Sequence, residues 1–336
     1  MRLITRSALK RLTVLIVVLG GLGIWAQQRM IRMPLRSFRG PLPPLSPAET
    51  VLREALRQDV RKLAADIGER NVFVPAKLRA AADSLEASLS SAGYRVTRQY
   101  FEASRERCCN LEVEILGQTH PDEIVIVGAH YDSVASCPGA NDNASGMAGL
   151  LALARAWAGR APARTVRFVA FVNEEPPFFQ TSQMGSLVYA RQCRERGKRI
   201  AAMLSLETIG YYDPAEGSQK YPFPIGLFYP SRGDFIAFVS NTGNARLVRR
   251  CVATFRRNTS FPSEGGALPG LLPGIGWSDH WSFWQAGYPA VMVTDTAPFR
   301  YPHYHTEEDK PDKLDYDRLA RVMTGLDQVV EELANR

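Results

Sequence analysis

The sequence predicts an α/β fold with a mostly parallel central sheet and helices on both of its faces. Short apolar, β-branched segments of strand length alternate along the chain with longer segments in which apolar residues recur at helical spacing. Polar residues follow directly after several of these strand segments, where open α/β sheets bind their ligands. The 336 residues are 45% hydrophobic and 22% charged, which is ordinary for a globular protein, and the length suits one large α/β domain.

Residues 1–33 have the composition of a membrane anchor or signal segment. Residues 12–26 are apolar and uncharged, and basic residues flank them on both sides at Arg2, Arg6, Lys10, Arg11, Arg29, Arg32, Arg36 and Arg39. The apolar run is short for a full membrane span of about 20 residues, and no clean small-x-small cleavage site follows it. We expect an uncleaved anchor or a secreted protein, with the remaining chain on the exported, periplasmic or extracellular side. A buried helix of a soluble domain is the alternative.

Charge and cysteine content argue against two classes of binding site. The formal net charge is +7, but much of the excess lies beside the N-terminal apolar run, and no basic stripe with interleaved aromatic residues follows. We therefore expect no nucleic-acid partner. The five cysteines are an odd number without a CxxC pair, which argues against a zinc–thiolate site. A disulfide between Cys108 or Cys109 and Cys137 remains open, as does burial of these thiols as small apolar side chains.

A linker and two helices are expected before the sheet. Residues 34–48 are rich in proline and predict a linker that forms neither helix nor strand. Ser46 and Glu49 have the spacing of a capping box, which predicts that a helix begins here and continues to about residue 67. A second helix is expected over residues 75–92.

The remaining chain alternates strand and helix patterns, which favours a parallel sheet covered on both faces. The predicted strands are residues 94–101, 110–116, 123–127, 165–172, 201–207, 225–229 and 290–294. The predicted helices are residues 146–159, 186–196, 234–241, 245–256 and 313–334. Residues 257–277 are dense in glycine, proline and serine, so we expect an irregular loop that forms a wall or lid of a site.

Histidines and carboxylates lie at or just beyond the ends of the predicted strands. This set comprises His130, Asp142, Glu174, Glu175, Glu207 and His305. Two histidines and three carboxylates suit a pair of zinc ions, with one bridging carboxylate and one carboxylate plus one histidine for each ion. Such a pair polarises a carbonyl and lowers the pKa of a bridging water. A strand-end histidine beside a helix cap is the alternative interpretation of His130 and residues 141–143.

Two further carboxylates fit roles beside the metal ligands. Glu174 and Glu175 are adjacent in an extended segment and would point to opposite sides of it, so that one can bind metal while the other acts as a general base. Asp132, two residues after His130, is placed to orient the imidazole of that histidine.

Five motifs in order resemble the di-zinc aminopeptidase family. They are His-x-Asp at 130–132, Gly-Ala-x-Asp-Asn-x-Ser-Gly at 139–146, Asn-Glu-Glu at 173–175, Leu-Glu-Thr-Ile-Gly at 206–210 and Tyr-His-Thr at 304–306. The family includes bacterial leucyl aminopeptidases and aminopeptidase S, and more distantly glutamate carboxypeptidase and glutaminyl cyclase. The resemblance covers about residues 110–330. It implies a three-layer zinc-exopeptidase fold for residues 49–336, two Zn²⁺ per chain, and peptide substrates with a free N-terminus.

The resemblance also implies a role for each site residue. Asp142 would bridge the two zinc ions, Glu175 and His305 would complete one metal site, and His130 and Glu207 would complete the other. Glu174 would be the general base that takes a proton from the metal-bridging water and passes it to the leaving amine. Asp132 would orient His130. Tyr304 would donate a hydrogen bond to the oxyanion.

Some positions depart from the family pattern or leave a choice open. His303 competes with His305 as the last ligand, and the Tyr-His-Thr motif favours His305. Residues 278–280 (Ser-Asp-His) are interpreted as supporting or pocket structure. Residues 176–184 replace a shorter connection in many relatives, and we expect them, with Phe178 and Phe179, to reshape the substrate pocket. Glu207 stands where several members have aspartate.

The sequence leaves three alternatives to a zinc aminopeptidase. The first is a single-zinc enzyme resembling glutaminyl-peptide cyclotransferase. The second is a carboxypeptidase of the same fold, which would need a cation such as Arg232, Arg256 or Arg257 for the terminal carboxylate of its substrate. The third is a non-catalytic binding domain. Cobalt or manganese could replace zinc at such a site.

Overall fold

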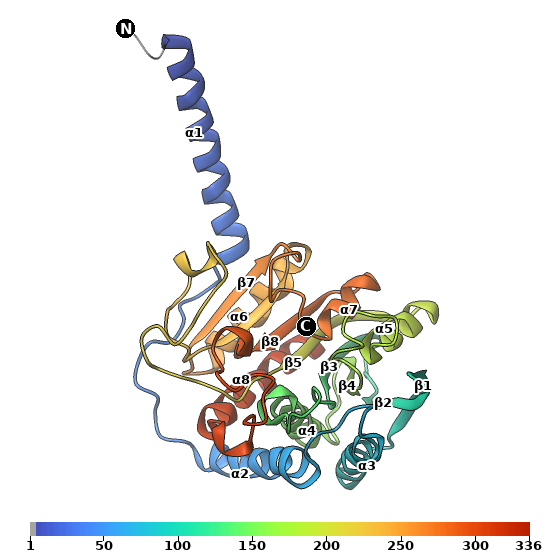
Figure 1. Cartoon of the computed structure of the whole chain (residues 1–336). Coiled ribbons are helices and arrows are strands. Elements are labelled where there is room, and N and C mark those ends of the chain that lie inside the picture. The colour runs from blue at the N-terminus through green and yellow to red at the C-terminus, as the bar shows by residue number, and fades with distance from the viewer. Residues whose placement is uncertain (1–4) are drawn as a thin grey trace.

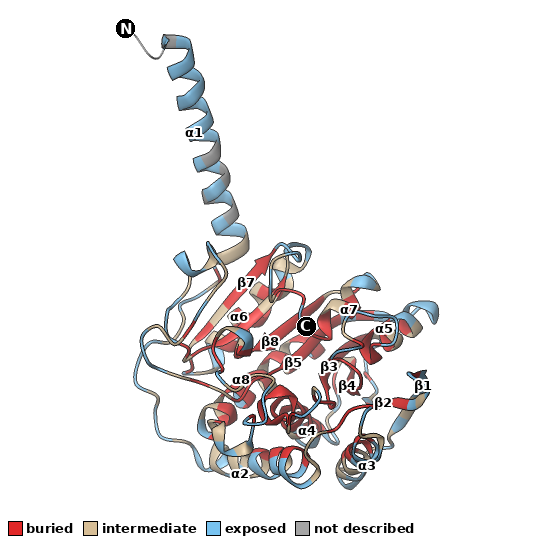
Figure 2. Ribbon diagram, in the orientation of Figure 1, coloured by how far each residue is buried: buried red, intermediate tan, exposed pale blue. Residues whose placement is uncertain are grey.

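The computed structural model describes residues 5–336, so the first four residues of the predicted anchor or signal segment, with Arg2, lie outside the described residues. Helix α1 (Arg6–Ala26) projects away from the rest of the protein (Figure 1) and is largely exposed (Figure 2). A π-helical turn (Gln27–Ile31) ends it. None of the helices within residues 5–336 combines the length and apolarity needed to cross a membrane. The role of this segment as an anchor or signal stays a prediction.

The proline-rich residues after this turn form neither helix nor strand, but they lie against the domain. Met33 is buried, Leu42 packs against the core, and the Arg321 guanidinium donates to the Pro43 carbonyl. Ser46 then caps the next helix as predicted: its Oγ accepts from the Glu49 N–H at 3.2 Å and its own N–H donates to the Glu49 carboxylate at 2.8 Å. The helices that follow are α2 (Pro47–Arg61), continued by a π-helical segment (Lys62–Ile67), and α3 (Pro75–Ser91).

Eight strands form one central sheet with the order β1-β2-β4-β3-β5-β8-β6-β7. The pairs β3–β4, β3–β5, β5–β8 and β6–β7 are parallel, and the other three pairs are antiparallel. The sheet is therefore mostly parallel, as predicted. The strands are β1 (Thr97–Ala103), β2 (Glu106–Ile115), β3 (His120–His130), β4 (Arg164–Phe171), β5 (Arg199–Glu207), β6 (Ile236–Asn241), β7 (Ser263–Leu268) and β8 (Ala290–Thr294).

Helices cover both faces of the sheet because the central strands are apolar on both sides. Along β3, Val125 and Val127 belong to one hydrophobic cluster, whereas Ile124 and Ile126 belong to another on the opposite face. The first face is covered by α4 (Gly146–Trp157), α6 (Ala245–Asn258) and α8 (Tyr316–Asn335), and the second by α5 (Gly185–Glu195) and α7 (His280–Gln285). This confirms the three-layer prediction, and the burial of the strands is visible in Figure 2.

Two elements predicted in the C-terminal half are wrong. The helix predicted over residues 234–241 is strand β6, which lies between β8 and β7 and buries Ile236 and Phe238 in the core. Its β-branched and aromatic residues suit a strand buried on both sides. The strand predicted over residues 225–229 is instead a 3-10 turn at Ile225–Leu227. Prolines surround it at positions 222, 224 and 230, and proline cannot donate to a strand ladder.

The irregular loop predicted over residues 257–277 is wrong in part, because it contains β7. Gly265 and Gly266 in the middle of this strand lower its propensity and hide it from a pattern-based prediction. The rest of the segment, from residue 269 to α7, is irregular.

Candidate metal centre

The parallel strands bring most of the predicted site residues to one edge of the sheet. His130 is the last residue of β3, Glu207 is the last residue of β5, and Glu174 follows β4 by three residues. Asp142 lies in the turn before α4, where its φ of −110° and ψ of 91° interrupt the helical backbone. His305 lies in the loop before α8 and has a φ of 58°.

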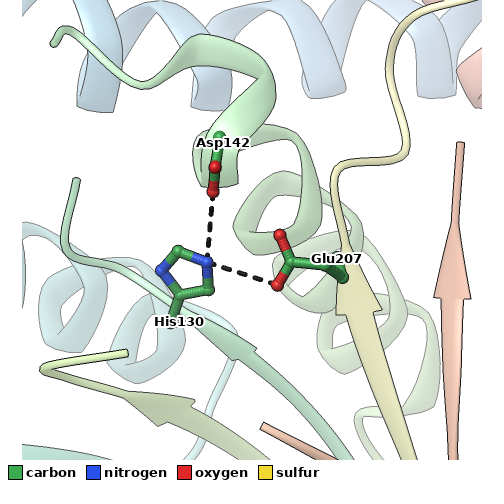
Figure 3. Close-up of side chains that lie close together, drawn as sticks. All are labelled: His130, Asp142 and Glu207. Carbon is green, nitrogen blue, oxygen red and sulfur yellow. Dashed lines mark ion pairs between the residues drawn. The ribbon is translucent and has the colours of Figure 1, made fainter. Parts of the chain in front are cut away.

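His130, Asp142 and Glu207 form the first group of candidate ligands (Figure 3). His130 Nε2 lies 3.2 Å from Asp142 Oδ1 and 3.3 Å from Glu207 Oε2. All three side chains are nearly or fully buried. One nitrogen and two oxygens from separate elements therefore converge on the same point.

Asp142, Glu175 and His305 form the second group. His305 Nε2 lies 3.1 Å from Asp142 Oδ2 and 3.3 Å from Glu175 Oε2. The two groups thus share Asp142, and each of its carboxylate oxygens faces a different histidine. All five predicted metal ligands are brought together in the predicted pairing.

The chemistry of these groups fits divalent cations. Asp142 Oδ1 and Glu175 Oε1 are buried without a hydrogen-bond partner. Burial raises the pKa of Glu175 and of Glu207 to about 7, because several carboxylates crowd into one desolvated space. Bound cations would offset this repulsion and keep the carboxylates ionised. A histidine nitrogen with carboxylate oxygens is a ligand set that zinc accepts.

Asp132 and Asp309 hold the ligand-bearing loops from behind. Asp132 Oδ1 lies 3.5 Å from His130 Nδ1, and the Asp132 carboxylate accepts the backbone N–H groups of Glu174 at 3.2 Å and Glu175 at 3.1 Å. One carboxylate therefore orients a histidine ligand and the Glu-Glu pair together. Asp309 accepts the N–H groups of residues 141 and 142, at 2.7 and 3.1 Å, and so fixes the backbone of the aspartate that the two groups share.

Arg70 also shapes the site, and the sequence reasoning missed it. Its guanidinium is fully buried and donates to the carbonyls of Tyr131 at 2.6 Å, Pro138 at 2.5 Å and Gly139 at 2.8 Å. It therefore holds the loop between His130 and Asp142. The only signal in the sequence was an arginine between two helices. Apart from the nearby Gly68 carbonyl, the partners of its guanidinium are backbone carbonyls 61 to 69 residues away in the chain.

Glu174 and Tyr304 lie beside the metal ligands. Glu174 Oε2 lies 4.0 Å from His130 Nε2, and burial raises the pKa of Glu174 well above its ordinary value. The Tyr304 ring stacks on the His305 ring, with 3.9 Å between the centroids. Burial and the nearby carboxylates raise the pKa of Tyr304 well above its ordinary value, so its hydroxyl stays a donor. His303 is in neither ligand group and packs edge-on against Tyr301.

Residues 278–280 support the site rather than joining either ligand group. Ser278 Oγ donates to Glu207 Oε2 at 2.8 Å. His280 is fully buried, its Nε2 lies 2.8 Å from the Ile275 carbonyl, and burial lowers its pKa to about 4. His280 is therefore neutral and tied to the loop that precedes it.

A cavity opens beside Glu207 and Tyr304 and encloses about 810 Å³, its open mouth included. Apart from these two residues its lining is mainly apolar and aromatic, with Tyr221, Tyr229, Phe235, Ile275, Trp277 and Phe299 among the large side chains. The segment predicted as a wall, residues 257–277, contributes one side of this cavity.

The structure also tests the predictions about Phe178 and about the cysteines. Phe178 is buried in the core rather than in the cavity wall, and the inserted segment contacts the wall through Gln180 Nε2, which donates to the Gly276 carbonyl at 3.0 Å. All five cysteines are buried and free, so Cys137 pairs with neither Cys108 nor Cys109. Of the two alternatives left open by the sequence, a disulfide or burial as small apolar side chains, the structure shows burial.

Comparisons with known proteins agree with this geometry. A family model described as peptidase family M28 matches residues 110–330. The uncharacterized protein YfbL of Escherichia coli (strain K12) is 38% identical over 282 residues, covering 81% of this chain and 86% of that protein. This chain spans about half the length of fungal relatives named probable zinc metalloprotease, which are 28% to 29% identical.

Solved structures share the fold. BSAP, a zinc aminopeptidase from Bacillus subtilis, superposes with a TM-score of 0.69 at 16% identity, covering 84% of this chain and 95% of that chain. A glutaminyl cyclase from Fimbriiglobus ruber superposes with a TM-score of 0.61 at 21% identity, covering 90% of this chain and 99% of that chain. At these identities the likeness shows the fold alone.

Proposed function

The chain belongs to peptidase family M28, and from this premise we propose that it is a zinc-dependent aminopeptidase that removes N-terminal residues from peptides. The observation that carries the proposal is the position of Asp142, whose two carboxylate oxygens face His130 and His305 at 3.2 and 3.1 Å. One carboxylate shared by two complete ligand groups is the arrangement that a two-metal hydrolytic site needs.

The two ligand groups would each hold one zinc ion. His130 and Glu207 would bind the first ion, Glu175 and His305 the second, and Asp142 would bridge them. Zinc ions bound there would polarise the carbonyl of the scissile peptide bond and lower the pKa of an attacking water. The proposal extends to cobalt or manganese, which accept the same ligand types.

Glu174 and Tyr304 would carry out the remaining steps. The Glu174 carboxylate takes a proton from the attacking water as the water oxygen bonds to the carbonyl carbon. It then gives this proton to the nitrogen of the leaving amine as the carbon–nitrogen bond breaks. The Tyr304 hydroxyl donates to the carbonyl oxygen as that oxygen gains negative charge. Asp132 keeps Glu174 in place through the backbone N–H that it accepts.

The cavity supports an aminopeptidase over a carboxypeptidase. It would receive the side chain of the N-terminal residue, because Glu207, a candidate metal ligand, and Tyr304 line it. A carboxypeptidase needs a cation for the terminal carboxylate of its substrate, yet no lysine or arginine of the described chain lines the cavity. Arg232 pairs with Glu216 at 2.9 Å. Arg256 does not line the cavity: it pairs with the lining residue Glu264 at 3.5 Å, which neutralises its charge, and donates to the Pro34 carbonyl at 3.1 Å.

Hydrolysis of two matched substrates tests the proposal on the zinc-loaded full-length protein. We expect L-leucine p-nitroanilide to be cleaved and its N-acetylated form to resist, because only the first offers a free amine. The substitution Glu174→Gln should lower kcat by about a hundredfold or more, the range of general-base catalysis, without changing the zinc content. Equal cleavage of both substrates, or an active Glu174→Gln variant, would contradict the proposal.

A further inference from the structure

Strand β7 forms a wall of the cavity three strands away from β5, which ends at Glu207, and we call it the far wall for this reason. The residues of β7 give it little stability of its own. Glu264, Gly266 and Leu268 line the cavity, and β7 stands at the end of the sheet next to β6. Two adjacent glycines in a six-residue strand lower its propensity and give it little side-chain packing. The stability of an edge strand of this kind depends on the segments that pack against it.

A side chain approaches each of the two glycines so closely that a Cβ there would clash with it. On the cavity face, a Cβ at Gly266 would lie 2.9 Å from Tyr229 Oη, and this hydroxyl donates to the Gly265 carbonyl at 2.8 Å. On the opposite face, a Cβ at Gly265 would lie 2.8 Å from Met33 Cγ. The strand is therefore held between Tyr229, which lines the cavity, and Met33, which comes from the N-terminal segment.

Residues Met33–Ser37, which we call the strap, are bonded to β7 and to α6 together. Ser37 Oγ accepts the N–H of Ser263, the first residue of β7, at 2.9 Å. The Arg256 guanidinium donates to the carbonyls of Pro34 and Leu35 at 3.1 Å each and to Ser263 Oγ at 3.1 Å. The Arg256 side chain is only 5% exposed, so its bonds to Pro34 and Ser263 are partly shielded from water, whereas its bond to Leu35 lies at the surface.

We propose that the strap determines which N-terminal side chains the cavity selects, by holding β7 in place as its far wall. The inference rests on the proposed aminopeptidase function. A large apolar side chain would extend to this wall, and its binding would depend on the position of Tyr229 and Gly266. A methyl side chain would stay near Glu207 and Tyr304 and would not depend on the wall. The strap is a positioning element, and its residues touch neither substrate nor metal.

The test compares phenylalanine and alanine p-nitroanilides on zinc-loaded full-length protein carrying Met33→Ala, Ser37→Ala or Arg256→Gln. The ratio of kcat/KM for phenylalanine to kcat/KM for alanine should fall by about tenfold, the lower end of what one methylene contact contributes in an apolar pocket. The alanine rate and the zinc content should stay unchanged. Hydrogen exchange of the backbone amides in residues 263–268 should become faster in the same variants.

Arg249→Gln is the matched control, because Arg249 lies on the same helix and bonds the carbonyls of Gln28 and Arg32, upstream of the strap. It should leave the ratio unchanged. An unchanged ratio in the strap variants, or an equal loss for both substrates, would overturn the inference. If the wild-type protein cleaves neither substrate, the proposed function fails. The affinity ratio of phenylalanine hydroxamate to alanine hydroxamate, which needs no turnover, then decides the inference by the same criterion.

Discussion

Asp142 is the residue that both groups of candidate metal ligands share. Its Oδ1 and Oδ2 face separate histidines, and its backbone is fixed by Asp309. Burial alone would raise the pKa of Asp142, but the close contacts with His130 and His305 outweigh burial and hold this pKa below its ordinary value. The two histidines therefore favour the ionised form of this shared carboxylate.

His305 and His303 provide a test at the scale of single residues. His305→Ala removes the only nitrogen ligand of the second group, so metal analysis should find about one zinc per chain in place of two. Peptidase activity should fall by more than the roughly 10–100-fold that a supporting partner of a metal ligand contributes. His303→Ala is the matched control and should keep both metals and full activity. The opposite result for the two variants would show that the ligand has been misassigned.

Strand-end positions made His130 and Glu207 predictable, but the choice between residues within a loop could not be made in this way. His130 and Glu207 end buried strands, and a buried apolar run followed by a polar residue is visible in the sequence. His303 and His305 lie in an irregular loop, where spacing gives no side-chain direction. The positive φ of 58° at His305 is a property of the folded loop and cannot be inferred from the sequence. Only the family motif therefore favoured His305 over His303 as the ligand.

At the scale of elements, the sequence predicted those strands and helices that have a regular apolar pattern. Strands β3, β4, β5 and β8 carry continuous apolar runs and were predicted. Strand β7 was missed, because two glycines interrupt its apolar pattern. The side chains that require these glycines, Met33 and Tyr229, are distant in sequence. The strand predicted at 225–229 is wrong because neighbouring prolines prevent it. The helix predicted at 234–241 is wrong because pairing within the sheet overrides local propensity.

The loop between β3 and α4 provides a test at this scale through Arg70. Arg70→Met leaves the carbonyls of Tyr131, Pro138 and Gly139 without their buried donor. Each such group costs about 1–3 kcal/mol, so urea unfolding should show a loss of about 3 kcal/mol or more. Arg79→Met is the control, because Arg79 is exposed and pairs with Glu106 at 3.6 Å, an interaction worth about 0–1 kcal/mol. Equal losses would contradict this role of Arg70.

At the scale of the whole molecule, the sheet gathers several carboxylates at one edge, and bound metal ions would compensate for their repulsion. Removing the metals with a chelator should lower Tm by several degrees, because a ligand that binds only the folded state at 1,000 times its Kd contributes about 4 kcal/mol. Differential scanning calorimetry with and without chelator measures this shift. The Asp142→Ala variant should respond much less. A chelator-insensitive wild-type protein would contradict metal binding at this edge.

The zinc content of the purified full-length protein, measured together with its activity, tests the central claim most directly. The shared Asp142 predicts two zinc ions per chain and hydrolysis of peptides that have a free N-terminus. One zinc ion per chain, with conversion of N-terminal glutamine to pyroglutamate and without peptide hydrolysis, would contradict the two-metal centre and identify a cyclase on this fold.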